Sequence, residues 1–150
     1  MDRRNFLKHS VSTVATVLLS PVASAEELFI KDERKMKIVV LCENSAQPPY
    51  QGEHGLSLYI ETSNHKLLFD CGQSDLLLQN AKLAGVDLTK VDTVILSHGH
   101  YDHCGGLLSF YQMNPHAKIY LHQKAGDGYY HIEEGIHKYI GINPDILKLN

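Results

Sequence analysis

Runs and alternations of hydrophobic residues predict a series of short strands in this chain. Three consecutive aliphatic residues, Ile38 to Val40, indicate a buried strand, and the run from Val94 to Leu96 indicates another. From Leu56 to Glu61, Leu and Ile alternate with Ser, Tyr and Glu, which is typical of a half-buried strand. The predicted strands cover residues 37–42, 56–61, 66–69, 93–97 and 118–122.

A helix is predicted over residues 74–84. The hydroxyl of Ser74 can cap its N-terminus, and Leu77 and Ala81 fall on one face at helical spacing. Gly85 follows the last residue of the pattern and is expected to end the helix.

A second helix is predicted over residues 102–113. Gly105 and Gly106 weaken it intrinsically, but we expect them to let it approach the sheet closely. Residues 43–55 are rich in Pro, Gly and Gln and are expected to form a loop. After Gly126 no clean period remains, and the scattered Tyr and Ile residues there indicate partial burial.

The first 25 residues resemble a twin-arginine export signal. Arg3 and Arg4 open the pattern Arg-Arg-Asn-Phe-Leu-Lys, and the apolar stretch at 11–19 is too short for a permanent membrane anchor. Ala23-Ser24-Ala25 fits the small-x-small cleavage rule and predicts a mature start at residue 26. We therefore expect export of the folded protein to the periplasm. An uncleaved amphipathic helix is the alternative.

Composition indicates an ordinary globular domain, which we place at residues 36–150 after a charged linker at 26–35. Hydrophobic residues make up 43% of the chain and charged residues 21%. The net charge of −3 and the lack of a basic stripe argue against a nucleic-acid partner. Because Cys42, Cys71 and Cys104 cannot all pair, we favour small buried thiols. A metal-binding Cys104 or a Cys71–Cys104 disulfide remains open.

The strongest chemical signal is the hexapeptide His-Gly-His-Tyr-Asp-His at residues 98–103, directly after an apolar run. In extended backbone His98 and His100 point to the same side, and Gly99 permits a sharp turn of the chain. The carboxylate of Asp102 suits the start of a helix. Imidazole and carboxylate groups are ligands of Zn²⁺, Fe and Mn, so this pattern predicts a metal site. Surface histidines on a loop are the alternative.

With this motif, followed by Gly-Gly, the chain resembles the metallo-β-lactamase superfamily. The similarity runs from residue 37 to about 142 and includes Leu-Ser-Leu-Tyr-Ile-Glu at 56–61 and Leu-Leu-Phe-Asp-Cys-Gly at 67–72. The nearest subgroup is that of 7,8-dihydropterin-6-methyl-4-(β-D-ribofuranosyl)-aminobenzene-5'-phosphate synthase. The resemblance implies an α/β fold, the αβ/βα sandwich, of which this chain covers mainly the N-terminal αβ half.

The resemblance also implies two divalent metal ions per complete site, usually zinc, with iron or manganese as alternatives. His98 and His100 would bind one ion, and Asp102 and His103 the other. Asp102 would also orient the attacking hydroxide. Asp70 would hydrogen-bond the ligand loop, unless it serves only as a turn residue.

The implied reaction is hydrolysis of an ester, phosphoester, thioester or amide in a small-molecule substrate. His54 is a candidate to contact substrate, although a solvated loop histidine is the simpler interpretation. His122, at the end of a predicted strand, is the best-placed late metal ligand. A di-iron redox or binding module with the same ligands is an alternative function.

In the resembling fold the metals lie between two similar αβ halves, and further ligands follow well after the histidine motif. Only four histidines follow it here, at positions 116, 122, 131 and 137. We therefore expect the chain to be the N-terminal half of a longer enzyme. Such a half would bind metal weakly and would expose an apolar sheet face through which it can self-associate.

Overall fold

The computed structural model describes residues 36–149 of the chain. The expected export signal and the linker after it lie outside the described residues, so both stay predictions. The elements in chain order are β1 (Lys37–Cys42), β2 (Ser57–Glu61), β3 (Lys66–Phe69), α1 (Leu76–Leu83), η2 (Leu88–Lys90), β4 (Thr93–Ile95), α2 (Tyr101–Cys104), α3 (Leu107–Met113), β5 (Lys118–Tyr120), η3 (Gln123–Gly126), β6 (Tyr130–Glu133), β7 (Ile136–Tyr139) and η4 (Ile146–Lys148).

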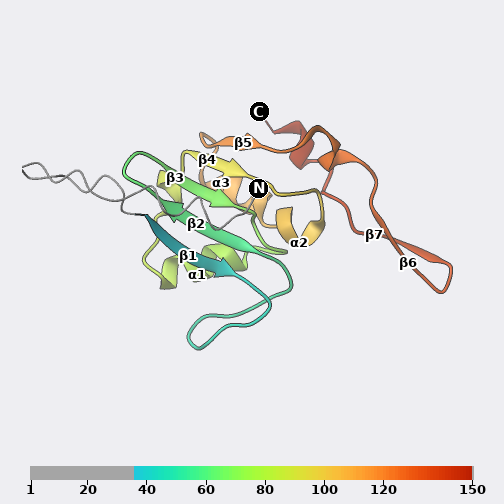
Figure 1. The fold of residues 1–150 in the computed structure, drawn as a ribbon, viewed down its shortest axis with the longest axis horizontal. Helices are drawn as coiled ribbons and strands as arrows, with labels where there is room; N and C mark the ends of the chain where they lie inside the picture. The colour runs from blue at the N-terminus through green and yellow to red at the C-terminus, as the bar shows by residue number, and fades with distance from the viewer. Residues whose placement is uncertain (1–35, 150) are drawn as a thin grey trace, which may run out of the picture. The chain divides into compact units, whose positions relative to one another are not determined.

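Strands β1 to β5 form one sheet, and their order across the sheet is their order along the chain (Figure 1). β1, β2 and β3 pair antiparallel, whereas β3, β4 and β5 pair parallel. Parallel neighbours need a crossover connection, which α1 supplies between β3 and β4, and α2 with α3 between β4 and β5. The carboxyl ends of β3 and β4 consequently meet at one edge of the sheet. Asp70 follows the first, and the histidine motif follows the second.

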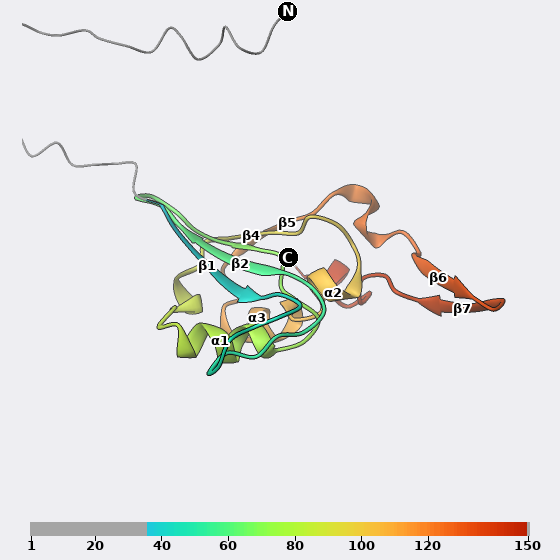
Figure 2. The ribbon, with the colours of Figure 1, turned by 60° about the horizontal axis from the view of Figure 1, so that its bottom comes forward.

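The hydrophobic core lies between the sheet and the helices α1 and α3, which lie together on one side of it (Figure 2). Leu68 and Val94 from the strands are fully buried there, together with Leu77 of α1 and Phe110 of α3. The β2 residue that joins them is Tyr59, rather than the aliphatic residues of that strand. The predicted alternation in β2 is therefore confirmed, but the helices cover the face of Tyr59, and the aliphatic residues of this strand lie on the other face.

The first predicted helix is confirmed, and the second is wrong as a single helix. In α1, Leu77 and Ala81 are buried and the Ser74 hydroxyl accepts a hydrogen bond from the Leu76 N–H at 3.2 Å. The predicted 102–113 helix divides at Gly105 and Gly106 into α2 and α3. At the break the backbone comes very close to the segment at residues 71–74. An added Cβ would lie 2.1 Å from the Gln73 carbonyl oxygen at position 105 and 2.3 Å from the Cys71 carbonyl oxygen at position 106.

Residues 130–139 form a hairpin that extends away from the sheet (Figures 1 and 2). Glu134 and Gly135 both have positive φ at its tip, as a tight two-residue turn requires. Every residue of β6 and β7 is exposed, so the partial burial expected there is wrong for the strands. Residues beyond them behave differently, because Gly141 and Ile142 are buried.

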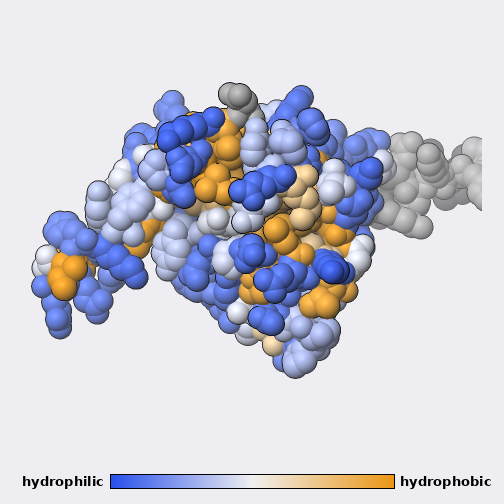
Figure 3. All heavy atoms as spheres, turned by 180° about the vertical axis from the view of Figure 1, so that it is seen from behind, coloured by the Kyte–Doolittle hydropathy of each residue, from blue (hydrophilic) through white to orange (hydrophobic). Residues whose placement is uncertain are grey.

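The surface on the far side from the Figure 1 view carries hydrophobic patches separated by hydrophilic side chains (Figure 3). One apolar groove of about 450 Å³ is lined by Leu78, Val86, Leu88 and Met113. None of the helices in residues 36–149 is long and apolar enough to span a bilayer.

Candidate metal-binding site

The histidine motif forms a tight loop between the end of β4 and the start of α2. β4 ends at Ile95, two residues earlier than predicted, although the Leu96 N–H still donates to the Tyr120 carbonyl at 2.9 Å. Gly99 permits close packing, since an added Cβ would lie 1.9 Å from the Ala125 carbonyl oxygen. His100 keeps an extended backbone and directly precedes α2. The loop is therefore fixed by its neighbours rather than free on the surface.

The motif presents its four candidate ligands as two pairs of donor atoms. His98 Nε2 lies 3.1 Å from His100 Nδ1, and their ring centroids are 4.6 Å apart. Asp102 Oδ2 lies 3.5 Å from His103 Nε2. The rings of His98 and His103 are 4.2 Å apart, so the two pairs adjoin.

These separations fit the spacing of metal ligands. Two donors about 2.1 Å from one tetrahedral ion are about 3.4 Å apart, close to the separation in both pairs. A neutral imidazole is the form that binds metal, and burial together with the neighbouring His103 and His100 lowers the pKa of His98 below its usual value. Within residues 36–149, however, no group of three or more His, Cys, Asp or Glu side chains is arranged to hold an ion. The described chain thus offers two donors for each ion.

Asp70 is fully buried and joins the ligand loop to the end of β3. Its Oδ1 accepts from the Ser97 N–H at 2.8 Å, and its Oδ2 accepts from the Ser97 hydroxyl at 2.7 Å. Oδ2 also lies 2.7 Å from His103 Nδ1, which leaves Nε2 of that ring facing Asp102. The backbone of Asp70 has φ 57°, an uncommon conformation that Asp tolerates better than most residues. This geometry is more than a turn requires and fits the expected orienting role.

The structure separates the two further candidates. His54 reaches the site, because its Nε2 lies 3.2 Å from Asp102 Oδ2. His122 instead accepts a hydrogen bond at Nδ1 from the Lys124 N–H at 3.2 Å and caps η3. It has a local backbone role that its position at the end of a strand did not indicate.

Residues beyond the motif complete the surroundings of His100, and sequence reasoning missed them. The ring of Tyr129 meets that of His100 edge-on, with centroids 5.1 Å apart. The Tyr101 N–H donates to the Ile140 carbonyl at 3.0 Å, and His100 forms a bridge with Gly141. These contacts come from segments with no hydrophobic period, so no sequence signal pointed to them.

Comparison with known proteins identifies the family. The family model of the metallo-beta-lactamase superfamily matches residues 50–148. The chain belongs to the metallo-β-lactamase superfamily.

Its relatives are considerably longer. It is similar to the uncharacterized protein MJ0448 of Methanocaldococcus jannaschii, 34% identical over 69% of this chain and 43% of the relative. A second relative from that organism is 7,8-dihydropterin-6-methyl-4-(beta-D-ribofuranosyl)-aminobenzene-5'-phosphate synthase, 35% identical over 58% of this chain and 32% of the relative. The crystal structure of Tm1679, a metal-dependent hydrolase of the superfamily, superimposes with a TM-score of 0.62 at 37% identity, over 77% of this chain and 40% of that one. The chain spans less than half the length of each.

The superfamily fold buries all three cysteines as free thiols, as favoured from the sequence. Burial and the nearby carboxylates of Asp102 and Asp70 raise the pKa of Cys104 to about 12. Its thiol donates to the His100 carbonyl at 2.9 Å and so supports the ligand loop. Burial and the adjacent Glu53 likewise raise the pKa of Cys42 to about 12.

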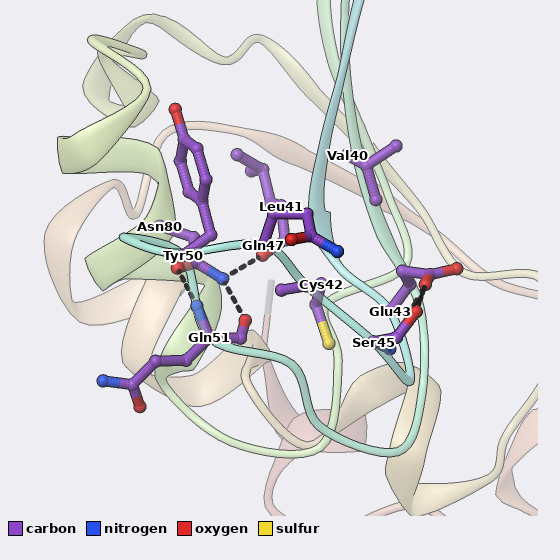
Figure 4. Close-up of a pocket in the computed structure, with 10 residues that line it drawn as sticks. Val40, Leu41, Cys42, Glu43, Ser45, Gln47, Tyr50, Gln51 and Asn80 are labelled. Atoms are coloured by element: carbon purple, nitrogen blue, oxygen red, sulfur yellow. Dashed lines mark hydrogen bonds between the residues drawn. The ribbon is translucent and has the colours of Figure 1, made fainter.

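The 43–55 loop, which contains His54, also has an anchor outside the 98–103 motif. It borders a pocket of about 250 Å³ together with the end of β1 and Asn80 of α1 (Figure 4). The Asn80 amide donates to the carbonyls of Leu41 and Gln51, both at 2.8 Å, and its oxygen accepts from the Gln51 N–H at 3.2 Å. Asn80 thereby holds the loop against α1 through both polar atoms of its side chain.

Proposed function

We propose that this chain carries the metal-binding loop of a metal-dependent hydrolase. His98 and His100 would hold one divalent ion, and Asp102 and His103 a second. Zinc is the expected metal, with iron or manganese as alternatives. The observation that carries the proposal is the pair of donor separations, 3.1 Å and 3.5 Å, side by side on one loop.

The residues around the ligands would prepare them for catalysis. Bound ions of this kind lower the pKa of water and polarise carbonyl or phosphoryl oxygens. Asp70 would keep the His103 ring turned so that Nε2 faces the ion, through the bond to Nδ1. Asp102 would bind through one carboxylate oxygen and orient the attacking group with the other. These roles support hydrolysis of an ester, phosphoester, thioester or amide in a small molecule.

We further propose that residues 36–149 bind each ion weakly on their own. A catalytic zinc takes three protein ligands, and the described chain offers two for each ion. The superfamily relatives are more than twice as long as the parts that match, so hydrolysis by this chain would need ligands from additional polypeptide.

Metal content tests the ligand assignment. Alanine substitutions at 98, 100, 102 and 103 should each lower the metal bound per chain, measured by plasma mass spectrometry after equilibration with Zn²⁺. Far-ultraviolet circular dichroism should remain unchanged. His116→Ala is the control, because His116 is exposed and distant in sequence from the motif. Unchanged metal content in all four variants would refute the assignment.

The reaction class needs a separate assay. Phosphodiester, thioester and lactam substrates should be offered to the chain as it stands and to a version extended by any in-frame downstream sequence, both with metal. Hydrolysis of one class by either form supports the proposal, and no hydrolysis by both forms opposes it.

We also propose that the protein is exported through the twin-arginine route to the periplasm. The support is the Arg3-Arg4 pair and the small-residue site at 23–25. Replacing both arginines by lysine should leave the precursor in the cytoplasm in a fractionation assay. Continued periplasmic delivery would indicate a different route.

A further inference from the structure

The 53–55 segment brings an exposed histidine onto the most buried of the four candidate ligands. We infer that His54 is a positioning residue, which donates a hydrogen bond to the Asp102 carboxylate and holds it in its metal-binding orientation. This inference rests on the proposed metal site and adds to it a residue from outside the histidine motif.

The contact itself is well defined. His54 Nε2 lies 3.2 Å from Asp102 Oδ2, and His54 Nδ1 lies 3.0 Å from Asn44 Oδ1. A neutral ring carries one N–H and can donate to only one of these two oxygens, and we assign its proton to Nε2, which faces Asp102. The His54 side chain is 67% exposed, whereas that of Asp102 is 12% exposed. The histidine therefore covers a carboxylate that is otherwise enclosed by the protein.

The backbone next to His54 touches the ligand loop as well. Gly55 has φ +130°, and an added Cβ would lie only 2.0 Å from the Asp102 carbonyl oxygen. A residue with a side chain would have to push the two segments apart. The close approach of the two backbones thus places His54 next to Asp102 independently of the hydrogen bond between their side chains.

Glu53 anchors this segment from the other side. Its Oε1 accepts from the N–H groups of Gln73 and Ser74, both at 3.0 Å, and its Oε2 accepts from the Ser74 hydroxyl at 2.6 Å. The Glu53 carboxylate thus binds residue 53 to residues 73 and 74, which precede α1. His54 stands between two fixed points, Glu53 and Gly55, which is the arrangement expected of a positioning group.

The arrangement favours a hydrogen bond over a direct metal bond from His54. Among residues 36–149 no three ligand-type side chains are arranged to hold one ion, so the structure does not add His54 to Asp102 and His103 as a third ligand. The 3.2 Å separation of Nε2 and Oδ2 is within hydrogen-bond distance. Partners that hydrogen-bond a ligating group fix its orientation, and their loss weakens metal binding by about 10- to 100-fold.

The same chain offers a matched control in a second histidine–aspartate pair. His65 Nδ1 lies 3.4 Å from Asp92 Oδ1, and the His65 side chain is 66% exposed. This pair joins the β2–β3 turn to the start of β4, at the opposite ends of these strands from the ligand loop. It reproduces the pair of side chains and the exposure of the histidine at another location, although Asp92 is 42% exposed and Asp102 12%.

Metal affinity is the first readout, with Co²⁺ as the probe followed by its visible absorption. His54→Ala should weaken Co²⁺ binding about tenfold and shift its absorption bands. His54→Gln, which retains an N–H donor, should restore most of the affinity, and His65→Ala should leave it unchanged. Glutamine failing to rescue would overturn the inference, since His54 would then be a ligand. Unchanged affinity in His54→Ala would also overturn it.

A second readout does not depend on metal. In the metal-free chain, His54→Ala should speed hydrogen exchange of the amides from Tyr101 to Cys104 about fivefold, as expected for the loss of one hydrogen bond. Glu53→Gln should produce a change of the same kind, and His65→Ala none. If the wild-type chain binds no Co²⁺ yet shows these exchange effects, the proposed metal function fails while the positioning contact stands. Unchanged exchange in His54→Ala would refute the positioning role.

Discussion

The two faces of the five-stranded sheet are built from similar residues but have different surroundings. On the face toward α1 and α3, Leu68 and Val94 are fully buried. On the opposite face, Ile38 and Val40 of β1 are 52% and 54% exposed, and Tyr120 of β5 is 55% exposed. In the described part of the chain no helix covers this second face (Figure 2).

The difference shows that apolar residues on a sheet face do not determine whether helices pack against it. We call the face of Ile38, Val40 and Tyr120 the open face. The open face continues across β2 and β3, where Leu58, Ile60, Leu67 and Phe69 are partly buried. Contiguous apolar surface of this kind marks an interaction site or an association liability in a monomer. The two faces should therefore differ in their contribution to the free energy of unfolding, as they do in exposure.

The largest effect is expected where β3 ends beside the ligand loop. Asp70→Ala leaves the Ser97 N–H and hydroxyl without their buried acceptor, and should lower the free energy of unfolding by about 3 kcal/mol. Urea titration followed by circular dichroism measures this. Asp75→Ala is the control, because Asp75 is exposed and makes no cap hydrogen bond. A loss below about 1 kcal/mol for Asp70→Ala would mean that the network is not needed for stability.

The same substitution on the two faces compares them directly. Val94→Ala removes two methyl groups from the core and should cost about 2 kcal/mol in urea unfolding. Val40→Ala, on the open face, should change stability by less than about 0.5 kcal/mol. Equal losses would show that the open face is covered in solution.

Self-association tests that possibility. We expect the chain to associate through the open face, and Val40→Lys to weaken that association by about tenfold, because a charge would have to be buried. Sedimentation velocity over a range of concentrations measures it. Lys82→Glu, on the helix side, changes charge without touching the open face and should have little effect. A wild-type chain that stays monomeric at all concentrations would contradict the expectation.

The smallest effect concerns the end of β1, where Cys42 lies on the covered side. Its raised pKa, about 12 against an ordinary 9.0, means that folding favours the protonated thiol. This contribution is fully present below pH 9 and is lost as the pH rises from about 9 toward 12. At pH 9 the folded chain should therefore alkylate slowly at Cys42, and the urea-unfolded chain quickly, as peptide mapping by mass spectrometry can show. Equal rates would mean that the thiol is accessible.

Local patterns were enough to predict the five strands of the main sheet and the loop at residues 98–103, but not the hairpin of β6 and β7. The four ligands lie within six residues, so their meeting depends on one loop and little else. The break of the second helix was harder, because Gly105 and Gly106 are tolerated in a helix when packing allows it. Here Gly105 packs against Gln73 and Gly106 against Cys71, which lie 32 and 35 positions earlier in the sequence.

The rest of the site depends on contacts between distant segments. Tyr129 and Ile140 flank the hairpin at residues 130–139, whose strands have no buried face, so no hydrophobic period marks this segment. The alternation in β2 could not show which face is covered either, because that depends on the side to which the crossovers carry α1 and α3. The hydrophobic pattern of a single strand does not show on which side of the sheet the helices pack.

The strand order has a consequence for how the polypeptide acquires its structure during synthesis. Since β1 to β5 pair in the order in which they are made, each strand can join an edge that is already present, and none has to be inserted later. The His98–His103 loop follows β4 in the chain and is made before β5. Its cover from Tyr129 and Ile140 emerges from the ribosome only some 25 to 40 residues afterwards. A nascent chain would therefore display its imidazoles to the cytoplasmic metal pool for several seconds, at about 5–20 residues per second, before the Tyr129 ring packs against His100 and the Ile140 carbonyl accepts from the Tyr101 N–H.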